Sequence, residues 1–260
     1  MFRGLFSDRS LEPAMPFVTH RGQRIHYTVE GEGPLVVLQH GLFMDATSWK
    51  ANGVVDALVG RHRVVCVDSL GHGLSDKPAD PALYAQDQRA GDLAAVIDAL
   101  GDEKGGEAKA AVFGYSMGAW MAVGLARRHP EKISRLVVGG WDLLNGVPKT
   151  PNGPLTFDLF WAFARATAPA LVAWVTPEIE PAMRACFEAL GQLDGAREAV
   201  LGGGFPVLLW DGDQDAYHAP MQAFAAAEGL PFLSSPGGHV PAIETPGAET
   251  IATLAAFLKG

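Results

Sequence analysis

Short runs of apolar, often β-branched residues alternate along most of the chain with longer segments whose apolar positions recur at the period of a helix. Such strands, apolar on both faces and separated by helices, indicate a mostly parallel sheet with helices on both sides. The predicted strands are Pro16–His20, Ile25–Glu30, Leu35–Gln39, Val64–Asp68, Ala110–Gly114, Ile133–Gly139, Pro206–Trp210 and Pro231–Ser234. The predicted helices are Ala46–Leu58, Gln86–Leu100, Met117–Arg128, Pro220–Ala227 and Gly247–Leu258.

The alternation of strands and helices departs from a simple repeat in two places. The first two predicted strands have no helix between them, so we expect an antiparallel hairpin at the sheet edge that turns at Arg21 and Gly22. After Gly140, roughly 65 residues pass before the next convincing strand, and a structureless loop of that length is unusual. This segment is rich in Ala, Leu, Phe and Trp, which predicts a small helical cap over residues 142–204.

The predicted division of the chain is therefore an α/β core of residues 16–141 and 205–260 with the cap inserted into it. The core is expected to hold a doubly wound, eight-stranded sheet. Residues 1–15 contain several charged side chains and no apolar stretch typical of a secretory signal, so we interpret them as a disordered leader. The most apolar long window, Leu155–Val175, contains Asp158, Arg165 and Pro169, which argues against a membrane span.

Composition narrows the possible partners. The net charge is −9 without a basic cluster, so nucleic acid is not expected to bind. Only two cysteines are present, Cys66 and Cys186, far apart in the sequence; we interpret both as small buried apolar residues in a reducing compartment. Together with the lack of a signal, this favours a cytoplasmic protein.

The sequence Gly114-Tyr115-Ser116-Met117-Gly118 lies between an apolar strand and a helix. A serine at such a turn adopts a tight backbone conformation, and the small residues two positions before and after it let neighbouring main chains approach. This geometry lifts the hydroxyl out of the sheet and directs the positive end of the following helix toward it. Ser116 is therefore the candidate nucleophile.

A serine hydroxyl needs a base to take its proton and an acid to orient that base. Carboxylates follow the strand Pro206–Trp210 directly, and His239 follows the last strand after two glycines. Because catalytic groups of open α/β sheets gather at the carboxyl ends of strands, we expect Asp215 and His239 to meet Ser116 there. Asp213 and Asp142 remain alternatives for the acid, whereas His218 is interpreted as a loop residue.

The strand Leu35–Gln39 ends in His40-Gly41-Leu42-Phe43. The backbone N–H of Leu42, together with that of Met117, is positioned to stabilise a developing oxyanion. His40 and His72 flank glycines, and their expected role is to hold turns by hydrogen bonds. Neither a metal-binding cluster nor a phosphate-binding glycine loop is recognisable, so no metal and no cofactor are expected.

These motifs resemble those of the α/β-hydrolases, serine carboxylesterases and lactonases with a small cap among them, and the resemblance covers nearly the whole chain. The matching features are His40-Gly41 after the third strand, the Asp68 to Ser75 turn after the fourth, the elbow at Ser116, Gly212 with Asp215, and Gly238-His239. The resemblance implies Ser116 as nucleophile, Asp215 as acid, His239 as base, and Leu42 and Met117 as oxyanion donors. Ala119 stands where many relatives carry glycine, a small change.

The expected activity is hydrolysis of a small or medium, mostly apolar carboxylic ester by an acyl-enzyme on Ser116. The apolar cap favours such a small-molecule substrate, and Phe43, Trp141, Trp161 and Val240 are the candidate pocket residues. A lactonase, a carbon–carbon bond hydrolase or a cofactor-free perhydrolase would use the same three residues. A ligand-binding receptor on a hydrolase scaffold is the alternative from another class.

Overall fold

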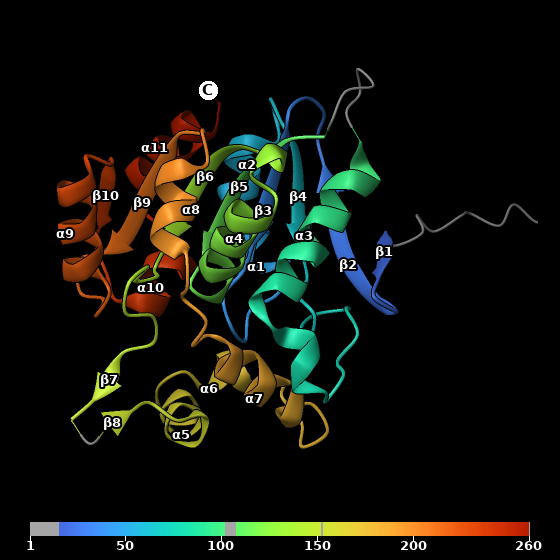
Figure 1. Ribbon diagram of the computed structural model, residues 1–260, viewed down its shortest axis with the longest axis vertical. Coiled ribbons are helices and arrows are strands. Elements are labelled where there is room, and N and C mark those ends of the chain that lie inside the picture. Colours follow the sequence, from blue (N-terminus) through green and yellow to red (C-terminus); the bar gives the residue numbers. More distant parts are fainter. Residues whose placement is uncertain (1–15, 102–107, 152, 260) are drawn as a thin grey trace, which may run out of the picture.

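A single eight-stranded sheet organises the computed structural model, which describes residues 16–101, 108–151 and 153–259 (Figure 1). The strand order is β1-β2-β4-β3-β5-β6-β9-β10; neighbours from β4 to β10 run parallel, and β1 and β2 form the predicted antiparallel hairpin. The strands are β1 (Phe17–His20), β2 (Gln23–Glu30), β3 (Leu35–Gln39), β4 (Arg63–Val67), β5 (Ala110–Tyr115), β6 (Ile133–Gly139), β9 (Val207–Gly212) and β10 (Phe232–Ser235). This architecture confirms the predicted fold class. The predicted leader, residues 1–15, lies outside the described residues.

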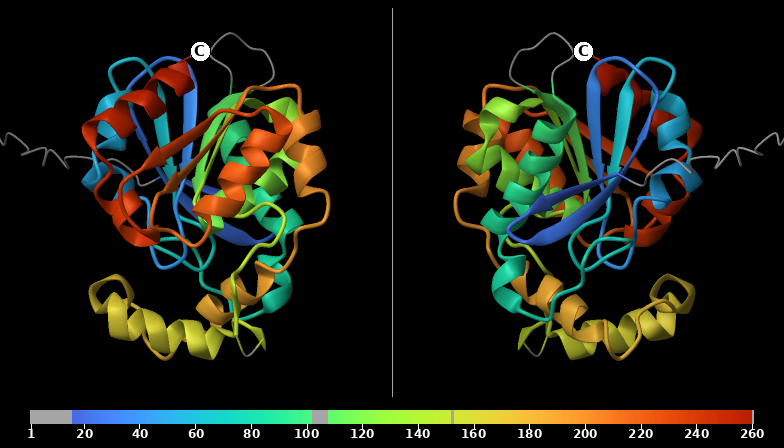
Figure 2. Two further views of the ribbon diagram at one scale, coloured as in Figure 1. Left: turned by 90° about the vertical axis from the view of Figure 1, so that its left-hand side faces the viewer. Right: turned by 90° about the vertical axis from the view of Figure 1, so that its right-hand side faces the viewer.

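Helices cover both faces of the sheet (Figure 2). Alternate residues of β3 show the division: Val37 packs in one apolar core, whereas Val36 and Leu38 pack in the other. The first core contains residues of α3 (Gln86–Leu100), α4 (Met117–Arg128), α8 (Ala196–Gly202) and α9 (His218–Glu228). The second contains residues of α1 (Ser48–Ala51), α2 (Val54–Leu58), α10 (His239–Glu244) and α11 (Ala248–Lys259). Both faces of the central strands β4, β3, β5, β6 and β9 are largely buried, which explains their continuous apolar runs.

Three local predictions need correction. The helix expected over Ala46–Leu58 is two short helices, because Gly53 has φ = 84° and ends the first before Val54 begins the second. Helix α10, which begins at His239, was not predicted. Strand β9 continues two residues beyond the predicted end at Trp210, so Asp211 lies within the sheet and is fully buried.

The described residues between β6 and β9 form a two-stranded hairpin and four helices. The hairpin is β7 (Lys149–Thr150) with β8 (Gly153–Pro154), and the further helices are α5 (Phe157–Thr167), α6 (Pro169–Val172) and α7 (Glu180–Ala189). Helices α5 to α7 lie across one end of the sheet, whereas α8 packs beside α4 (Figures 1 and 2). Stacking of the Phe160 and Phe187 rings, 4.9 Å apart, joins α5 to α7.

Two short 3₁₀ helices, Pro81–Tyr84 and Pro130–Lys132, complete the described elements. Cys66 and Cys186 are both buried and free, as expected. Within residues 16–101, 108–151 and 153–259, none of the helices combines the length and the apolar character that crossing a membrane requires.

Candidate active site

Ser116 occupies a strained turn between β5 and α4. Its backbone has φ = 54° and ψ = −121°, a conformation that non-glycine residues rarely adopt. The turn is possible only because its neighbours are glycines: a Cβ on Gly114 would lie 2.2 Å from the Gly118 carbonyl oxygen, and one on Gly118 would lie 2.1 Å from the Gln39 oxygen. The Ser116 N–H donates to the Gly139 carbonyl at 2.8 Å. The strain and close packing are the features that the motif predicted.

Ser116, His239 and Asp215 lie in one hydrogen-bonded line although they are remote in the sequence. His239 Nε2 lies 2.9 Å from Ser116 Oγ, and His239 Nδ1 lies 2.5 Å from Asp215 Oδ2. The Asp215 side chain is almost fully buried, whereas about a third of the His239 side chain is exposed. Burial raises the pKa of the Asp215 carboxyl, but the hydrogen bond and charge of His239 outweigh it, so that the pKa lies below its ordinary value.

The alternative acids have other partners. The Asp142 carboxylate accepts hydrogen bonds from the backbone N–H groups of Leu144 and Asn145 and so closes a turn after β6. Asp213 accepts from the Gly237 N–H and ties together the loops after β9 and β10. Of the three candidate acids, Asp215 contacts the imidazole. His218 begins α9 and bonds the Ser234 hydroxyl, away from Ser116.

The loop after β3 passes directly beside Ser116. A Cβ on Gly41 would lie 3.3 Å from Ser116 Cβ, so any larger residue there would crowd the serine at this close approach. Within the described chain, the Leu42 N–H makes no hydrogen bond. Met117 is the first residue of α4, so its N–H has no acceptor within the helix. Among the described residues, neither of the N–H groups expected to serve as oxyanion donors has a hydrogen-bond acceptor.

Two buried histidines hold this loop, as expected from the sequence. His40 Nε2 accepts the Ser69 N–H at 3.0 Å, and His72 Nε2 accepts the Phe43 N–H at 3.2 Å. Burial lowers the pKa of both imidazoles, and for His72 the decrease is large. Each ring is therefore neutral near pH 7 and keeps the lone pair that its Nε2 uses. Phe43 needs this support because its φ is 68°.

Asp68, the first residue of the predicted turn after β4, joins three segments around the site. Its carboxylate accepts hydrogen bonds from the Ala46 N–H, the Leu74 N–H and the His26 imidazole, all within 2.8 Å. Burial raises the pKa of the Asp68 carboxyl, but the Leu74 and Ala46 N–H donors, together with His40 and His26, hold the pKa below its ordinary value. A Cβ on Gly73 would lie 2.1 Å from this carboxylate, which explains the glycine in the turn.

An apolar cavity of about 270 Å³ lies between Ser116 and the cap. Among the described residues that line it, three can ionise: Asp215, Tyr217 and His239. No lysine or arginine is among these lining residues. The predicted pocket residues Phe43, Trp141 and Val240 line this cavity together with Leu42. From the cap, the cavity is lined by α5 through Phe160, Phe163, Ala164 and Thr167, by α6 through Leu171, and by α7 through Phe187.

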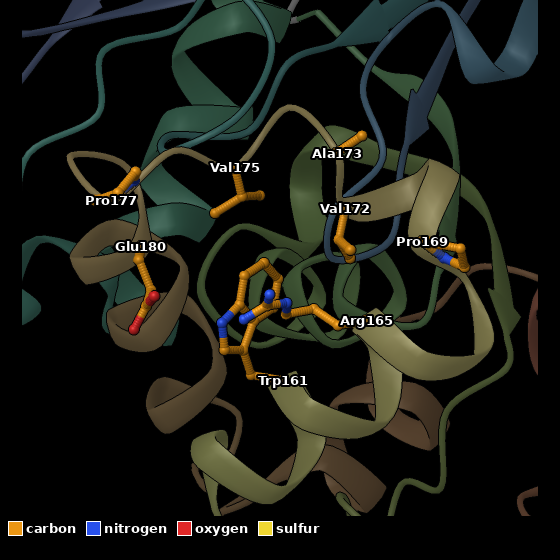
Figure 3. Close-up of a pocket in the computed structure, with 8 residues that line it drawn as sticks. All are labelled: Trp161, Arg165, Pro169, Val172, Ala173, Val175, Pro177 and Glu180. Carbon is orange, nitrogen blue, oxygen red and sulfur yellow. The ribbon is translucent and has the colours of Figure 1, made fainter.

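Trp161 does not line this cavity, which corrects its predicted place. It follows Phe160 on α5, and one residue along a helix turns the side chain by about 100° to another face. The Trp161 ring packs at a tilt against the Phe43 ring, with the ring centroids 5.5 Å apart. It lines a separate hollow of about 470 Å³ within the cap, where the Arg165 guanidinium lies over the indole (Figure 3).

The structure adds residues that sequence reasoning missed. The Tyr115 hydroxyl donates to the His239 carbonyl at 2.5 Å and fixes the main chain of the histidine. The Tyr217 ring packs edge-on against the His239 ring. The backbone N–H of Tyr217 donates a hydrogen bond to Asp215 Oδ1. Asp211 lies against Asp215. All three stand within or next to motifs that the sequence singled out, but no pattern along the chain indicated which way their side chains point.

Comparison with known proteins agrees with this architecture. Residues 34–194 match the family described as alpha/beta hydrolase fold. This match covers more than half of the chain, so the chain belongs to the α/β-hydrolase family.

Individual relatives have diverse descriptions. An uncharacterized protein of Mycobacterium tuberculosis is 31% identical over 180 residues, which are 69% of this chain and 49% of that protein. A cis-3-alkyl-4-alkyloxetan-2-one decarboxylase of Shewanella oneidensis is 34% identical over 133 residues, 49% of this chain and 40% of that protein. The chain thus spans half or less of the length of these curated relatives. The solved enol-lactonase of Burkholderia xenovorans is 27% identical, with a TM-score of 0.74 over 94% of this chain and 100% of that one.

Proposed function

We propose that this protein is a serine hydrolase that cleaves a small or medium, mostly apolar carboxylic ester through an acyl-enzyme on Ser116. The observation that carries the proposal is the hydrogen-bonded line from Ser116 through His239 to Asp215 at the wall of an apolar cavity. A strained serine at the wall of a cavity, a base within reach of its hydroxyl and a buried carboxylate behind the base are the arrangement that acyl transfer needs.

In the acylation step, Ser116 Oγ attacks the ester carbonyl carbon while His239 Nε2 takes the hydroxyl proton. Asp215 holds the Nδ1 proton of His239 and stabilises the imidazolium that forms. The carbonyl oxygen becomes an oxyanion, which accepts hydrogen bonds from the Leu42 and Met117 N–H groups. By analogy with other acyl-transfer sites, each donor contributes roughly 3 kcal/mol. When the tetrahedral adduct collapses, the leaving alcohol takes the proton from His239.

Deacylation repeats these roles with water as the nucleophile. His239 Nε2 removes a proton from water, the resulting oxygen attacks the acyl carbon, and the same two N–H groups hold the second oxyanion. Collapse breaks the bond to Ser116 Oγ, and His239 returns the proton to that oxygen. The products are one carboxylic acid and one alcohol for each ester and water consumed.

The lining of the cavity supports a neutral substrate. An acyl group that carried its own carboxylate would lose hydration on entry without gaining a lysine or arginine from the described wall. Aromatic and aliphatic side chains from α5 and α7 offer contacts to an alkyl or aryl group instead. We therefore expect activity to rise from acetyl to butyryl esters and to fall for long acyl chains.

A lactone is the second candidate substrate. The enol-lactonase is similar to this chain over almost its whole length. A lactone is a cyclic ester, so the same attack by Ser116 opens the ring and leaves the alcohol tethered to the acyl-enzyme.

A substrate panel tests both candidates. Purified wild type and Ser116→Ala are compared on p-nitrophenyl esters of increasing acyl length, on lactones and on a ring-cleavage dienoate. We expect turnover of short esters by wild type and a loss of about 10⁴-fold or more in the variant. Equal turnover by both would overturn the proposal, and a dienoate preferred over every ester would replace it with carbon–carbon bond hydrolysis. Slow, single-turnover acylation would favour a receptor.

A further inference from the structure

Asp211 is a buried carboxyl group directly behind the proposed acid. It stands near the end of β9, between Trp210 and Gly212, and none of its surface is exposed. Its Oδ1 accepts the Gly212 N–H at 2.8 Å. Its side chain is in hydrogen-bonding contact with the carboxyl of Asp215. Asp211 does not line the cavity, whereas Asp215 does, so Asp211 can act on the site indirectly through Asp215.

The contact between the two aspartates requires a proton. An ionised carboxylate only accepts hydrogen bonds, so two carboxylates cannot bond one another. Asp211 Oδ2 meets no N–H or O–H donor in the described part of the chain. The Asp215 carboxylate also bonds the His239 ring through Oδ2 and accepts the Tyr217 backbone N–H at Oδ1. A proton on Asp211 Oδ2 would give both groups a partner.

The surrounding charges favour the same arrangement. Within the described chain, Asp211 makes no ion pair with a lysine or arginine. The titratable groups that interact with it are Asp215, Tyr115 and Tyr217, and none of these carries positive charge. Burial and the charge of Asp215 both raise the pKa of the Asp211 carboxyl far above its ordinary value. Two adjacent buried carboxyl groups of this kind share one proton rather than both ionising.

We propose that Asp211 is a positioning residue that stays protonated at neutral pH and donates a hydrogen bond to the Asp215 carboxylate from the side opposite His239. This inference rests on the proposed function of Ser116, His239 and Asp215. The donated bond keeps the negative charge on Asp215 and fixes the direction of its carboxylate toward the imidazole. The hydrogen-bonded line then runs through four side chains rather than three.

Infrared spectroscopy detects the proton without any turnover. The difference spectrum of wild type minus Asp211→Asn at neutral pH should contain the C=O stretch of a protonated carboxylic acid. The same band should appear when both proteins also carry Ser116→Ala. Asp213→Asn is the matched control, because it removes an exposed carboxylate two residues along the chain and should remove no such band. Absence of the band in the Asp211 pair would overturn the proposal.

Kinetics separates a positioning role from a merely structural one. In Asp211→Asn, the amide can donate to Asp215 without charge, so kcat and the acid side of the kcat/KM pH profile should match wild type. Asp211→Leu removes the donor at similar volume and should lower kcat about tenfold with KM unchanged. Without its second donor, Asp215 should stabilise the imidazolium more strongly, so the acid-side midpoint of Asp211→Leu should move to higher pH.

Results that would overturn the proposed role of Asp211 can be told apart from one another. If Asp211 is ionised, Asp211→Asn removes a negative charge and moves the acid-side midpoint to lower pH, which would overturn the proposal. Wild-type kcat and pH profile in Asp211→Leu would exclude a positioning role. If Asp211→Leu does not fold, the infrared band and the pH profile of Asp211→Asn still test whether Asp211 is protonated. Retained turnover by Ser116→Ala would refute the proposed function while leaving the infrared result intact.

Discussion

The indole N–H of Trp174 donates to the backbone carbonyl of Phe43 at 2.9 Å and thereby ties the cap to the loop that carries the Leu42 N–H. The peptide on the other side of Phe43 bonds His72. The strained Phe43 backbone is thus held from the cap and from the turn after β4. The cap therefore both closes the apolar cavity and supports the geometry of the proposed oxyanion site.

Replacing Trp174 with Phe should loosen this loop without unfolding the protein. The variant keeps an aromatic ring but loses one hydrogen bond worth about 1 kcal/mol, so kcat on a short ester should fall about fivefold. Trp49→Phe is the control, because the buried Trp49 N–H has no partner among the described residues and its loss should leave kcat unchanged. An unchanged kcat in Trp174→Phe would show that the cap does not support the loop.

Stability should decrease below pH 6.5 because of the buried imidazoles. The pKa of His72 in the folded protein lies well below its ordinary value of 6.5, so the unfolded chain binds a proton there that the folded chain does not. The stabilisation is complete above pH 6.5 and is lost as the pH falls below it, by up to about 1.4 kcal/mol per pH unit. Urea unfolding at pH 7.5 and 5.5 measures this slope.

A pair of variants tests whether His72 causes this pH dependence of the free energy of unfolding. His72→Gln should unfold with a shallower pH dependence than wild type, because it removes one imidazole that stays neutral in the fold. His218→Gln should keep the wild-type slope, since His218 bonds Ser234 away from this loop. Equal slopes in all three proteins would contradict the assignment to His72.

Arg89→Met should stabilise the protein. The Arg89 side chain is fully buried on α3; one N–H contacts the Met117 sulfur, and Nε and Nη2 have no partner in the described chain. Burial of an unpaired charge is unfavourable, so methionine at this place should raise the free energy of unfolding by about 1–3 kcal/mol. Arg128→Met, which breaks an exposed pair with Asp87, should change it by less than about 1 kcal/mol. A lower free energy of unfolding for Arg89→Met would count against this reading.

Narrowing the cavity at Ala164 should shift substrate preference. Ala164 lies on the buried face of α5 and lines the cavity, so Ala164→Leu places three more carbons where the acyl chain is expected. The ratio of kcat/KM for butyryl over acetyl esters should fall about tenfold or more. Ala166→Leu, on the exposed face of the same helix, should leave the ratio unchanged. A similar change in both variants would place the acyl chain elsewhere.

Gly118→Ala should disrupt the turn at Ser116. The added methyl group would lie 2.1 Å from the Gln39 carbonyl oxygen and 2.7 Å from the His40 carbonyl oxygen, and backbone atoms cannot move aside as a flexible side chain can. We expect a loss of more than about 2 kcal/mol of stability together with loss of ester turnover. Gly202→Ala, at the end of α8 with nothing within 4 Å, should be neutral or stabilising. Thermal unfolding of both variants checks the contrast, and equal melting temperatures would contradict it.

Much of the fold follows from local pattern. The eight strands, the antiparallel first hairpin and the long helices α3 and α4 were predictable because a sheet buried on both faces needs continuous apolar runs, and its helices need an apolar stripe. The break at Gly53 and the helix that begins at His239 were missed, since each depends on a backbone conformation set by its surroundings. The Ser116 turn was predictable because glycine spacing records close approach of main chains.

By itself, the sequence determined the sheet, the strained serine and the order in which Ser116, Asp215 and His239 occur, because these depend on periodicity and on motifs at strand ends. Only the tertiary structure decided that Asp215 rather than Asp142 faces the imidazole, that Trp161 turns away from the cavity, and that Asp211 lies against Asp215. The reason is physical. Residue type and spacing set which backbone conformations are allowed, whereas the direction of a side chain and its partner across the molecule depend on packing between segments distant in sequence.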